Sequence, residues 1–552
     1  MMWPSRVTGA IGFGFLACAV LAQELLDPAL LSKPPTDAWP TYHGDYSGRH
    51  FSPLSQINQS NIKSLSLAWV YRTTPSSEGA IVGSEEQESS PERVNRDAKG
   101  PVIKAIPLMV NGVLYLSVPN HAYAVEAYTG RQIWHYYWRG RGAIGNRGMA
   151  MWGAWLYFET PDNNIVSLDA ATGKERWHKA VVPPVSPHFS TVAPVVVGKH
   201  ILTGIAGDSG GSSGWLEARN PETGEVEWRW YATPRAGQPG IETWPSEQAA
   251  DHGAGGPWQP PTYDPELNLI YVTTGNPAPV YLGSARPGKN LWTSSIVALN
   301  ADTGKLVWYF QTSPHDTHDW DATEVAVLLD ADIDGKPRRL LAQANRNGYY
   351  FLIDRTTGKN LLTKPFISSV NAYKGTDPHG VLIPNPAKEP QVGGTLVSPS
   401  SDGAANYPAP SFDPETKLFY VNATQSFSIY YAEAPKSSAG EGASMEYHTG
   451  FFHSALLALN YKTGEVKWRH DYPGTGFWSS TYPGILTTAG KLLFTGDPSG
   501  HFVARDPATG ADLWHSGVGA QITNSPETYL LDGTQYVVVA AADSLYAFSL
   551  QR

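Results

Sequence analysis

The most regular feature of the chain is a short phrase of polar, glycine and aromatic positions that recurs along its length. An acidic or Asn residue opens the phrase, Thr-Gly follows it, and a Trp stands four residues after the Gly. Six copies share this pattern: Glu126…Gly130…Trp134, Asp169…Gly173…Trp177, Asn220…Gly224…Trp228, Asn300…Gly304…Trp308, Asn460…Gly464…Trp468 and Asp506…Gly510…Trp514. A seventh copy, Asp354…Gly358, has Leu362 in the Trp position, and Leu67-Ala68-Trp69 resembles the end of an eighth unit whose start lies elsewhere.

Each position of this phrase has a physical role. Asp or Asn opens a turn by accepting hydrogen bonds from its own backbone, Gly takes the positive-φ position, and the next strand carries an inward-facing Trp. Recurrence indicates one supersecondary unit used repeatedly, with each Trp filling the gap to a neighbouring unit. We therefore predict an all-β fold, an eight-bladed β-propeller with tryptophan-docking repeats, in which strands from both chain ends complete one blade.

Segments between the repeats differ in character. Tyr263-Asp264-Pro265-Glu266 and Phe412-Asp413-Pro414-Glu415 each precede an apolar run, and they predict the same hairpin in two blades. Three polar or Pro- and Gly-rich inserts predict long surface loops, at Thr74–Gly100, Asn371–Ser401 and Ala432–Gly450.

Composition agrees with many short strands and limits the chemistry. The 552 residues are 41% hydrophobic and include 54 Gly and 44 Pro. A net charge of −10 without a basic stripe argues against a nucleic-acid partner. A single Cys excludes an internal disulfide framework, a CxxC zinc site, a thiolate iron–sulfur cluster and a CxxCH haem attachment.

The first 22 residues have the pattern of an export signal. Arg6 precedes a charge-free apolar run from Val7 to Ala22, which contains the only Cys, Cys18. An uncleaved membrane anchor and a lipoprotein signal are the alternatives. We expect cleavage after Ala22, a periplasmic or secreted product, a single propeller over residues 23–552, and no membrane span after signal removal.

Two clusters could carry chemistry by themselves. Gly207-Asp208-Ser209-Gly210-Gly211 spells the phrase around a serine-protease nucleophile, but no matching His phrase accompanies it. The run from Pro314 to Asp321 contains two His and three Asp. That run could bind zinc or iron, could cap turns, or could place Asp319 as a general base beside a hard cation.

Taken together, several motifs resemble the pyrroloquinoline quinone (PQQ) dependent alcohol dehydrogenases. Besides the repeats and the cluster around Asp319, they are Trp39-Pro40, Phe51-Ser52-Pro53-Leu54, Asn146-Arg147-Gly148, Thr274-Gly275-Asn276-Pro277, Arg286-Pro287-Gly288 and Asn345-Arg346-Asn347-Gly348. The resemblance covers essentially the whole chain after the signal. It implies PQQ at the propeller centre beside a Ca²⁺ or lanthanide ion, with a carboxylate that removes the alcohol proton.

The resemblance also implies roles for individual residues. Asp319 is the implied catalytic base and a metal ligand, and Arg346 is the cation that stabilises charge on the quinone oxygen. Trp258 is the implied aromatic floor beneath the cofactor. The remaining implied contacts are Thr160, Asn406 and Tyr482 for the cofactor, and Asn276 and Asp321 for the metal, with Asp321 at the position of the additional Asp of lanthanide-using members.

Three positions depart from the family pattern. The vicinal Cys pair is absent, because Cys18 is the only Cys. The family's ligand Glu falls on Ser209 with Asp208 beside it, and a hydroxyl is a weaker ligand for a hard cation than a carboxylate. Lys104 stands where a Glu often lies near the cofactor.

Two functions follow as expectations. The first is an exported oxidoreductase that uses PQQ and Ca²⁺ or a lanthanide to oxidise an alcohol or sugar hydroxyl to a carbonyl. Its electrons would pass to an external acceptor such as cytochrome c or a quinone. The alternative is a catalytically empty quinoprotein-like propeller that acts as a binding or scaffold protein.

Overall fold

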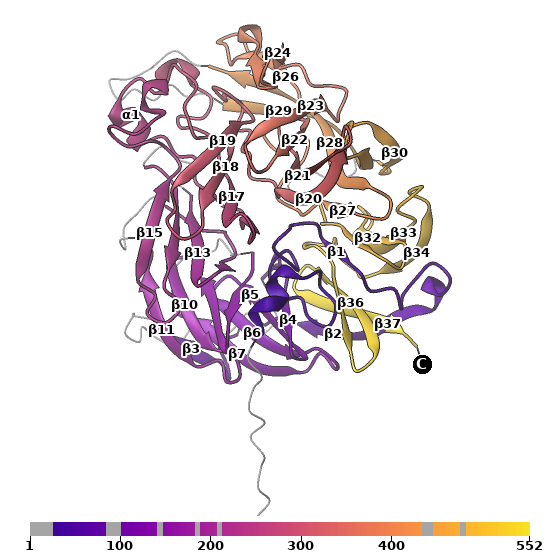
Figure 1. Cartoon of the computed structure of the whole chain (residues 1–552). Coiled ribbons are helices and arrows are strands. Elements are labelled where there is room, and N and C mark those ends of the chain that lie inside the picture. Colours follow the sequence, from indigo (N-terminus) through magenta and orange to yellow (C-terminus); the bar gives the residue numbers. More distant parts are fainter. Residues whose placement is uncertain are drawn as a thin grey trace, which may run out of the picture.

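The computed structural model describes residues 26–74, 76–83, 101–140, 147–182, 188–206, 212–432, 445–474 and 482–551. The expected signal segment 1–22, with Cys18, lies outside these ranges. Within them the chain is almost entirely β (Figure 1). The short helical elements are α1 (Glu247–Asp251) and the 3-10 turns η1 (Pro28–Ser32), η2 (Ile62–Ser64), η3 (Ile241–Thr243), η4 (Gly283–Ala285) and η5 (Pro386–Lys388).

The described strands form eight sheets of four or five strands and one hairpin sheet. Four sheets are built from consecutive strands: β8 (Ala150–Trp152), β9 (Trp155–Glu159), β10 (Asn164–Asp169) and β11 (Glu175–Ala180); β12 (Val195–Val197), β13 (His200–Ile205), β14 (Trp215–Arg219) and β15 (Val226–Tyr231); β16 (Thr262–Asp264), β17 (Leu269–Thr273), β18 (Ser295–Asn300) and β19 (Leu306–Gln311); β20 (Val327–Ile333), β21 (Lys336–Ala344), β22 (Tyr349–Asp354) and β23 (Lys359–Pro365).

The other sheets recruit more distant strands. They comprise β3 (Ile81–Gly83) with β4 (Leu108–Val110), β5 (Val113–Val118), β6 (His121–Glu126) and β7 (Gln132–Trp138); β26 (Thr395–Val397) with β27 (Ser411–Asp413), β28 (Leu418–Tyr431), β29 (Met445–Asn460) and β30 (Val466–Asp471); β1 (Phe51–Ser52) with β31 (Leu486–Thr488), β32 (Leu492–Gly496), β33 (His501–Arg505) and β34 (Asp512–Gly517); and β2 (Leu65–Arg72) with β35 (Glu527–Leu531), β36 (Thr534–Ala541) and β37 (Ser544–Leu550). The hairpin sheet is β24 (Tyr373–Thr376) with β25 (Leu382–Pro384).

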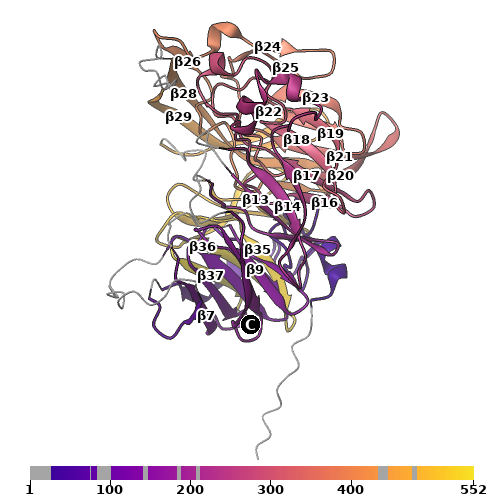
Figure 2. The same cartoon turned by 90° about the vertical axis from the view of Figure 1, so that its left-hand side faces the viewer.

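The sheets follow one another around a common centre, which makes the fold an all-β propeller type (Figures 1 and 2). Strand β2 pairs antiparallel with β37, with Trp69 opposite Ala547. The prediction that both chain ends share one sheet is therefore confirmed.

The recurring phrase forms the joints between sheets. Each repeat glycine has a φ between +64° and +77°, and a Cβ built on it would lie within 3.3 Å of the side chain at the Trp position of another repeat. The glycine-to-side-chain pairs are Gly130–Trp69, Gly173–Trp134, Gly224–Trp177, Gly304–Trp228, Gly358–Trp308, Gly464–Leu362 and Gly510–Trp468. Only a residue without a side chain fits both the backbone conformation and the contact.

Hydrogen bonds strengthen these joints. The indole Nε1 of Trp134 donates to Ala170 O at 2.9 Å, and Trp228 Nε1 donates to Ala301 O at 3.0 Å. Trp514 Nε1 donates to Leu65 O at 3.2 Å, which links the last copy of the phrase to β2. The contacts thus lead from β2 through every repeat and back to β2.

The N-terminal segment from Thr36 to Ser52 bonds to one strand from each of six sheets. Its carbonyl oxygens accept backbone N–H bonds from β4, β16, β20, β27, β31 and β35; the donors are Met109, Tyr263, Leu328, Phe412, Thr487 and Leu530. Because one short segment reaches all six, these strands must surround one centre. Trp39, in this segment, is fully buried.

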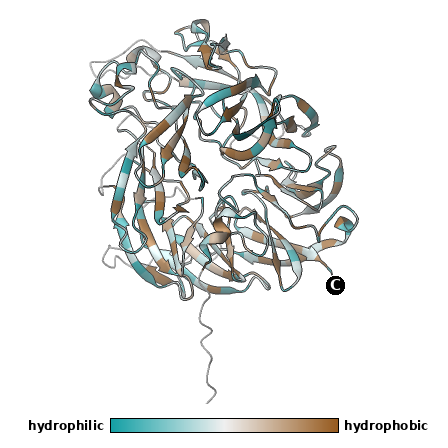
Figure 3. Ribbon diagram, in the orientation of Figure 1, coloured by the Kyte–Doolittle hydropathy of each residue, from teal (hydrophilic) through white to brown (hydrophobic). Residues whose placement is uncertain are grey.

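Apolar side chains fill the spaces between the sheets, and in Figure 3 most hydrophobic positions fall on strands. The twin hairpins are confirmed: in β16–β17 and β27–β28 the first strand ends with an Asp whose Oδ1 accepts the N–H of the Glu two residues later, at 2.9 and 2.8 Å.

The inserts differ in part from the predicted loops. Residues 371–401 form β24, β25, η5 and β26, and β26 pairs with β28. Residues 445–450 begin the long strand β29, and residues 81–83 form β3 alongside β7. Pairing with an existing sheet edge satisfies backbone groups that a polar composition does not reveal.

Gly173 tests the joints directly. Gly173→Ala places a Cβ 2.6 Å from the Trp134 ring at a φ of +69°, whereas Gly198→Ala meets no atom within 4 Å at a φ of +57°. We expect both variants to lose about 1–2 kcal/mol from the left-handed backbone, and Gly173→Ala to lose a further ~1–3 kcal/mol from the clash. Thermal unfolding midpoints measure the difference, and equal midpoints would contradict the docking role.

Two buried imidazoles make a pH-sensitive contact between β6 and β7. His121 Nδ1 and His135 Nε2 lie 2.8 Å apart, and the His135 ring stacks on Tyr123 at 4.4 Å. Burial, with a smaller contribution from His135, lowers the pKa of His121 to about 3, and burial lowers the pKa of His135 to about 4. The folded protein therefore resists protonation that the unfolded chain accepts near its ordinary pKa of 6.5.

We accordingly expect stability to fall as the pH decreases from 6.5 towards 4. His135→Gln, which does not titrate, should reduce that loss by more than about 1 kcal/mol, with exposed His252→Gln as the control. Unfolding midpoints at several pH values measure it. The same acid sensitivity in wild type and His135→Gln would show that the pair does not contribute.

Candidate active site

Buried side chains from several connections between strands meet around the indole of Trp258. Trp258 lies on the segment before β16 and is 8% exposed. The guanidinium of Arg147, just before β8, lies 4.5 Å from the Trp258 ring centroid and 4.3 Å from that of Tyr407. Arg346, which follows β21, lies 5.6 Å from the Trp258 ring. Two cations therefore approach one aromatic floor.

Asp321 holds this floor in place. Its Oδ2 accepts the Trp258 indole N–H at 2.8 Å and lies 3.3 Å from Arg346 Nη2. Its Oδ1 accepts the backbone N–H of Asn276. The side chain is 5% exposed, so these contacts replace the water that the carboxylate would otherwise bind.

Asp319 occupies the more open position of the two carboxylates. Its Oδ2 lies 3.9 Å from Arg346 Nη1, its side chain is 32% exposed, and its carbonyl oxygen accepts from Arg346 Nη1 at 2.8 Å. The residue has a φ of +67°, a left-handed conformation that costs energy in a residue with a Cβ. The loop thus directs a partly accessible carboxylate beside a buried cation.

Arg346 lies among several carboxylates. Besides Asp319 and Asp321, Glu324 Oε1 approaches Arg346 Nε at 3.9 Å. Burial opposes the charge of Arg346, but the attraction of Asp321, Asp319 and Glu324 outweighs it and raises the pKa of the guanidinium. Burial raises the pKa of Glu324 well above its usual range.

Arg147 has the opposite electrostatic setting. It donates through Nη1 to Thr191 and to Trp258 O at 3.3 Å, and no carboxylate of the described chain lies within 4 Å of it. Burial lowers the pKa of its guanidinium. Sequence reasoning gave this residue no role, although it lies in the Asn-Arg-Gly motif; Tyr407 carried no sequence signal.

The loop from Pro314 to Asp321 is held by Arg286 and Asp316. The Asp316 carboxylate accepts the N–H groups of His318 and Trp320 at 3.1 and 2.9 Å, and Arg286 donates to the Asp316 carbonyl. Burial raises the pKa of Asp316 to about 6. These contacts fix the backbone on both sides of Asp319.

The two histidines of this loop are engaged structurally. His315 Nδ1 pairs with Gly288 O at 2.8 Å, and His318 Nε2 pairs with Lys388 O at 2.9 Å. Across the described ranges, no three His, Cys, Asp or Glu side chains are grouped to hold a metal. Each imidazole thus uses one ring nitrogen to hold the loop to a backbone carbonyl of another segment.

The implied metal ligand Asn276 lies beside the cluster, since its backbone binds Asp321 and its Nδ2 donates to Pro277 O at 3.2 Å. Asn406 lies on the Tyr407 loop, with Oδ1 accepting from Tyr407 N at 2.8 Å. Tyr482 pairs through its hydroxyl with Thr424.

Thr160, an implied cofactor contact, bonds within its own turn. Its hydroxyl pairs with Asp162 and accepts from Asn164 N at 3.0 Å. Lys104 is near Arg147, and desolvation and the Arg147 charge lower its pKa. Asp208 and Ser209, with the whole 207–211 phrase and Asn146, lie outside the described residues.

Comparisons with known proteins show which protein family the chain resembles. A family model described as the glucose/ethanol/alcohol dehydrogenase β-propeller domain of the PQQ type matches residues 39–155 and 182–364. A model described as the outer membrane protein assembly factor BamB matches residues 452–552. Among the described residues, no helix has the length and apolarity to cross a membrane.

Relatives agree with the first of these models. A quinohemoprotein alcohol dehydrogenase of Comamonas testosteroni is 34% identical over 92% of this chain and 72% of its own length. The quinoprotein alcohol dehydrogenase PedH of Pseudomonas putida is 33% identical over 90% of this chain and 84% of its own length. A solved europium-containing methanol dehydrogenase superposes with a TM-score of 0.81 at 27% identity, covering 95% of this chain and 99% of that one.

These findings define a propeller-type dehydrogenase. The chain belongs to the PQQ-dependent alcohol dehydrogenase family and is an alcohol dehydrogenase-like enzyme, as the sequence motifs implied.

Asp321→Asn tests the role of Asp321 as an anchor. The amide keeps the shape but turns a donor towards either the Trp258 N–H or the Asn276 N–H, and it removes the charge beside Arg346. We expect a loss of about 1–3 kcal/mol, against no measurable loss for exposed Asp332→Asn. Thermal unfolding followed by tryptophan fluorescence measures both, and an unchanged midpoint for Asp321→Asn would refute the anchoring role.

Proposed function

We propose that this protein oxidises an alcohol or sugar hydroxyl to a carbonyl with PQQ and a bound Ca²⁺ or lanthanide ion. The observation that carries the proposal is the pair of buried guanidiniums, Arg147 and Arg346, which lie 4.5 and 5.6 Å from the ring centroid of Trp258. A planar, carboxylated quinone matches a broad aromatic ring with two cations close to it.

The side chains present fit such a group. Arg147 is a buried cation without a carboxylate neighbour in the described chain, and its Nε has no hydrogen-bond partner there. An anionic ligand would supply that missing charge, because an uncompensated buried cation is costly. Arg346 Nε is likewise without a hydrogen-bond partner in the described chain, so it could donate to a ligand oxygen.

Oxygen donors for a hard cation are available nearby. Asp319, Asp321 and the amide oxygen of Asn276 would hold the metal, and Asp208 and Ser209 are the further ligands implied by the sequence. The europium in the name of the methanol dehydrogenase relative supports a lanthanide as one choice. Asp321 adds the extra negative charge that a trivalent ion favours.

Different residues of the chain would have different roles in the reaction. Bound PQQ supplies the two-electron acceptor. Asp319, the more exposed carboxylate, would accept the alcohol proton at its Oδ atoms, while Arg346 beside it would stabilise negative charge that develops at the site. Trp258, held by Asp321, would orient the reacting groups.

The proposal extends to the fold, the location and the electron acceptor of the protein. We propose that the eight sheets are the eight blades of one closed propeller over residues 23–552, supported by the cycle of joints that returns from Trp514 to Leu65. The apolar N-terminal run supports export to the periplasm or outside the cell. Electrons would then pass to a separate acceptor, cytochrome c or a quinone.

Reconstitution tests the function. Purified protein given PQQ with Ca²⁺ or La³⁺ should oxidise alcohols with an artificial electron-accepting dye, and its unfolding midpoint should rise because ligands stabilise the state that they bind. Asp319→Asn should reduce turnover by at least about 100-fold, while the absorbance of the protein shows that the quinone stays bound. Asp332→Asn is the matched surface control and should leave turnover unchanged.

If neither metal gives quinone absorbance or a thermal shift, the proposed enzyme activity is wrong and a propeller without a bound cofactor is favoured. Unchanged turnover in Asp319→Asn would remove Asp319 as the base.

A further inference from the structure

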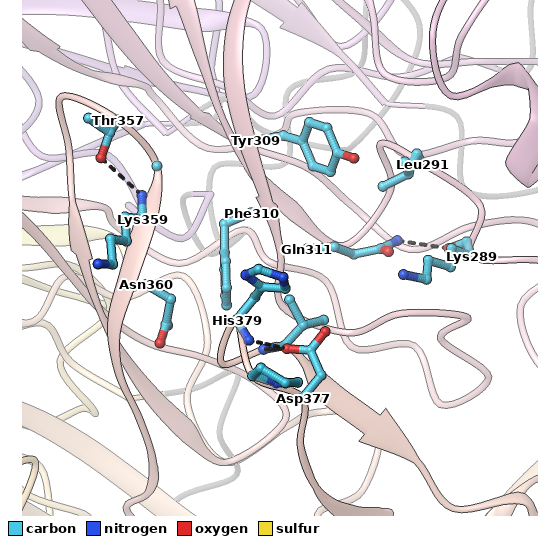
Figure 4. A pocket seen from close by; sticks show the side chains of 13 residues that line it. Lys289, Leu291, Tyr309, Phe310, Gln311, Thr357, Lys359, Asn360, Asp377 and His379 are labelled. Atoms are coloured by element: carbon cyan, nitrogen blue, oxygen red, sulfur yellow. Dashed lines mark hydrogen bonds between the residues drawn. The ribbon is translucent and has the colours of Figure 1, made fainter.

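A pocket of about 470 Å³, whose lining does not include Trp258, lies where the edges of two sheets meet (Figure 4). One wall is the end of β19, from Tyr309 to Gln311. The facing wall is the turn and first residues of β23, from Thr357 to Asn360. The β24–β25 turn, from Asp377 to Val381, and the segment Lys289–Leu291 complete it.

The walls of this pocket are already ordered by hydrogen bonds. Asp377 Oδ1 accepts the N–H groups of His379 and Val381 at 2.8 and 3.0 Å, and Thr363 Oγ1 donates to Gly380 O at 2.7 Å. Gln311 Nε2 donates to Lys289 O at 2.8 Å. A ligand would therefore enter a preformed space, and its binding would not cost conformational entropy for ordering the walls.

The floor of the pocket is apolar and aromatic. Phe310 and Leu291 are 5% and 6% exposed, and Tyr309 presents a ring that is 44% exposed. An apolar ligand body would cover this ring and remove more of its surface from water.

The rim is cationic, in a chain whose net charge is −10. Lys289 and Lys359 lie on opposite sides of the pocket, with Phe310 and His379 between them in Figure 4. In the described parts of the chain, neither ammonium has a carboxylate within 4 Å. The one carboxylate of the lining, Asp377, already uses an oxygen for its own turn.

We propose that this pocket binds a small organic monocarboxylate with an apolar body. The ring and aliphatic floor would take the body, and the positive charges of Lys289 and Lys359 at the rim would attract the carboxylate, with one of the two ammoniums in contact with it. A bare inorganic anion would leave the apolar floor uncovered, and a neutral ligand would gain no attraction from the two exposed ammoniums.

The pocket is separate from the proposed quinone site but shares a structural element with its surroundings. The wall segment Lys289–Leu291 continues from Arg286, which binds Asn290 Oδ1 at 2.9 Å and the carbonyl of Asp316. None of the residues around Trp258 lines this pocket.

Calorimetric titration of the full protein with benzoate, benzamide and inorganic phosphate tests the proposal. Benzoate should bind, and benzamide, its neutral isostere, should bind at least about tenfold more weakly because the charge-assisted contacts are lost. Phosphate should also bind more weakly than benzoate, since it lacks the apolar body.

The double substitution Lys289→Met and Lys359→Met should weaken benzoate binding by at least about tenfold, and Lys374→Met, an exposed lysine outside the pocket, should not. All variants are first shown to keep the wild-type unfolding midpoint. Equal binding of benzamide and benzoate, phosphate as tight as benzoate, or benzoate binding that survives the double substitution would each overturn the proposal. The titration needs neither PQQ nor turnover, so its outcome is independent of the proposed enzyme activity.

Discussion

The contact of an indole on a glycine of another repeat is the constraint on which the rest of the structure depends. A sheet with one apolar face needs a partner, and here each partner is the neighbouring sheet, held by a large ring against a position that tolerates no Cβ. Leu362 replaces the indole at one joint and still packs on Gly464. Trp514 returns this series of contacts to Leu65, so every joint is linked to the next one as far as β2.

The arrangement of the sheets around one centre brings the residues of the candidate site together. Six sheets each bring one strand to the segment Thr36–Ser52, and connections that are far apart in sequence lie close together beside them. Arg147, Trp258, Asp321 and Arg346 come from four such connections. Buried charges are costly singly, and the cluster around Arg346 compensates them mutually, whereas Arg147 keeps an excess of positive charge that suits an anionic ligand.

The sequence was informative wherever a feature depends on residues close in the chain. The turn, the positive-φ glycine and the twin Asp-Pro-Glu hairpins are local, and all were predicted correctly. The inserts were predicted less well, because whether residues 395–397 form a strand depends on the edge of β28, more than 20 residues away. Arg147 was overlooked for the same reason, since its cation–π contacts involve residues 111 and 260 positions away.

By itself, then, the sequence determined the repeating unit, the all-β class and the family, since each rests on short patterns whose physics is local. Only the tertiary structure decided that Asp321 anchors Trp258, that Asp319 keeps an accessible carboxylate, and that a pocket lined by two lysines forms beside β19. Those properties depend on which distant loops share a space, and burial, distance and charge compensation exist only once the ring of sheets has formed.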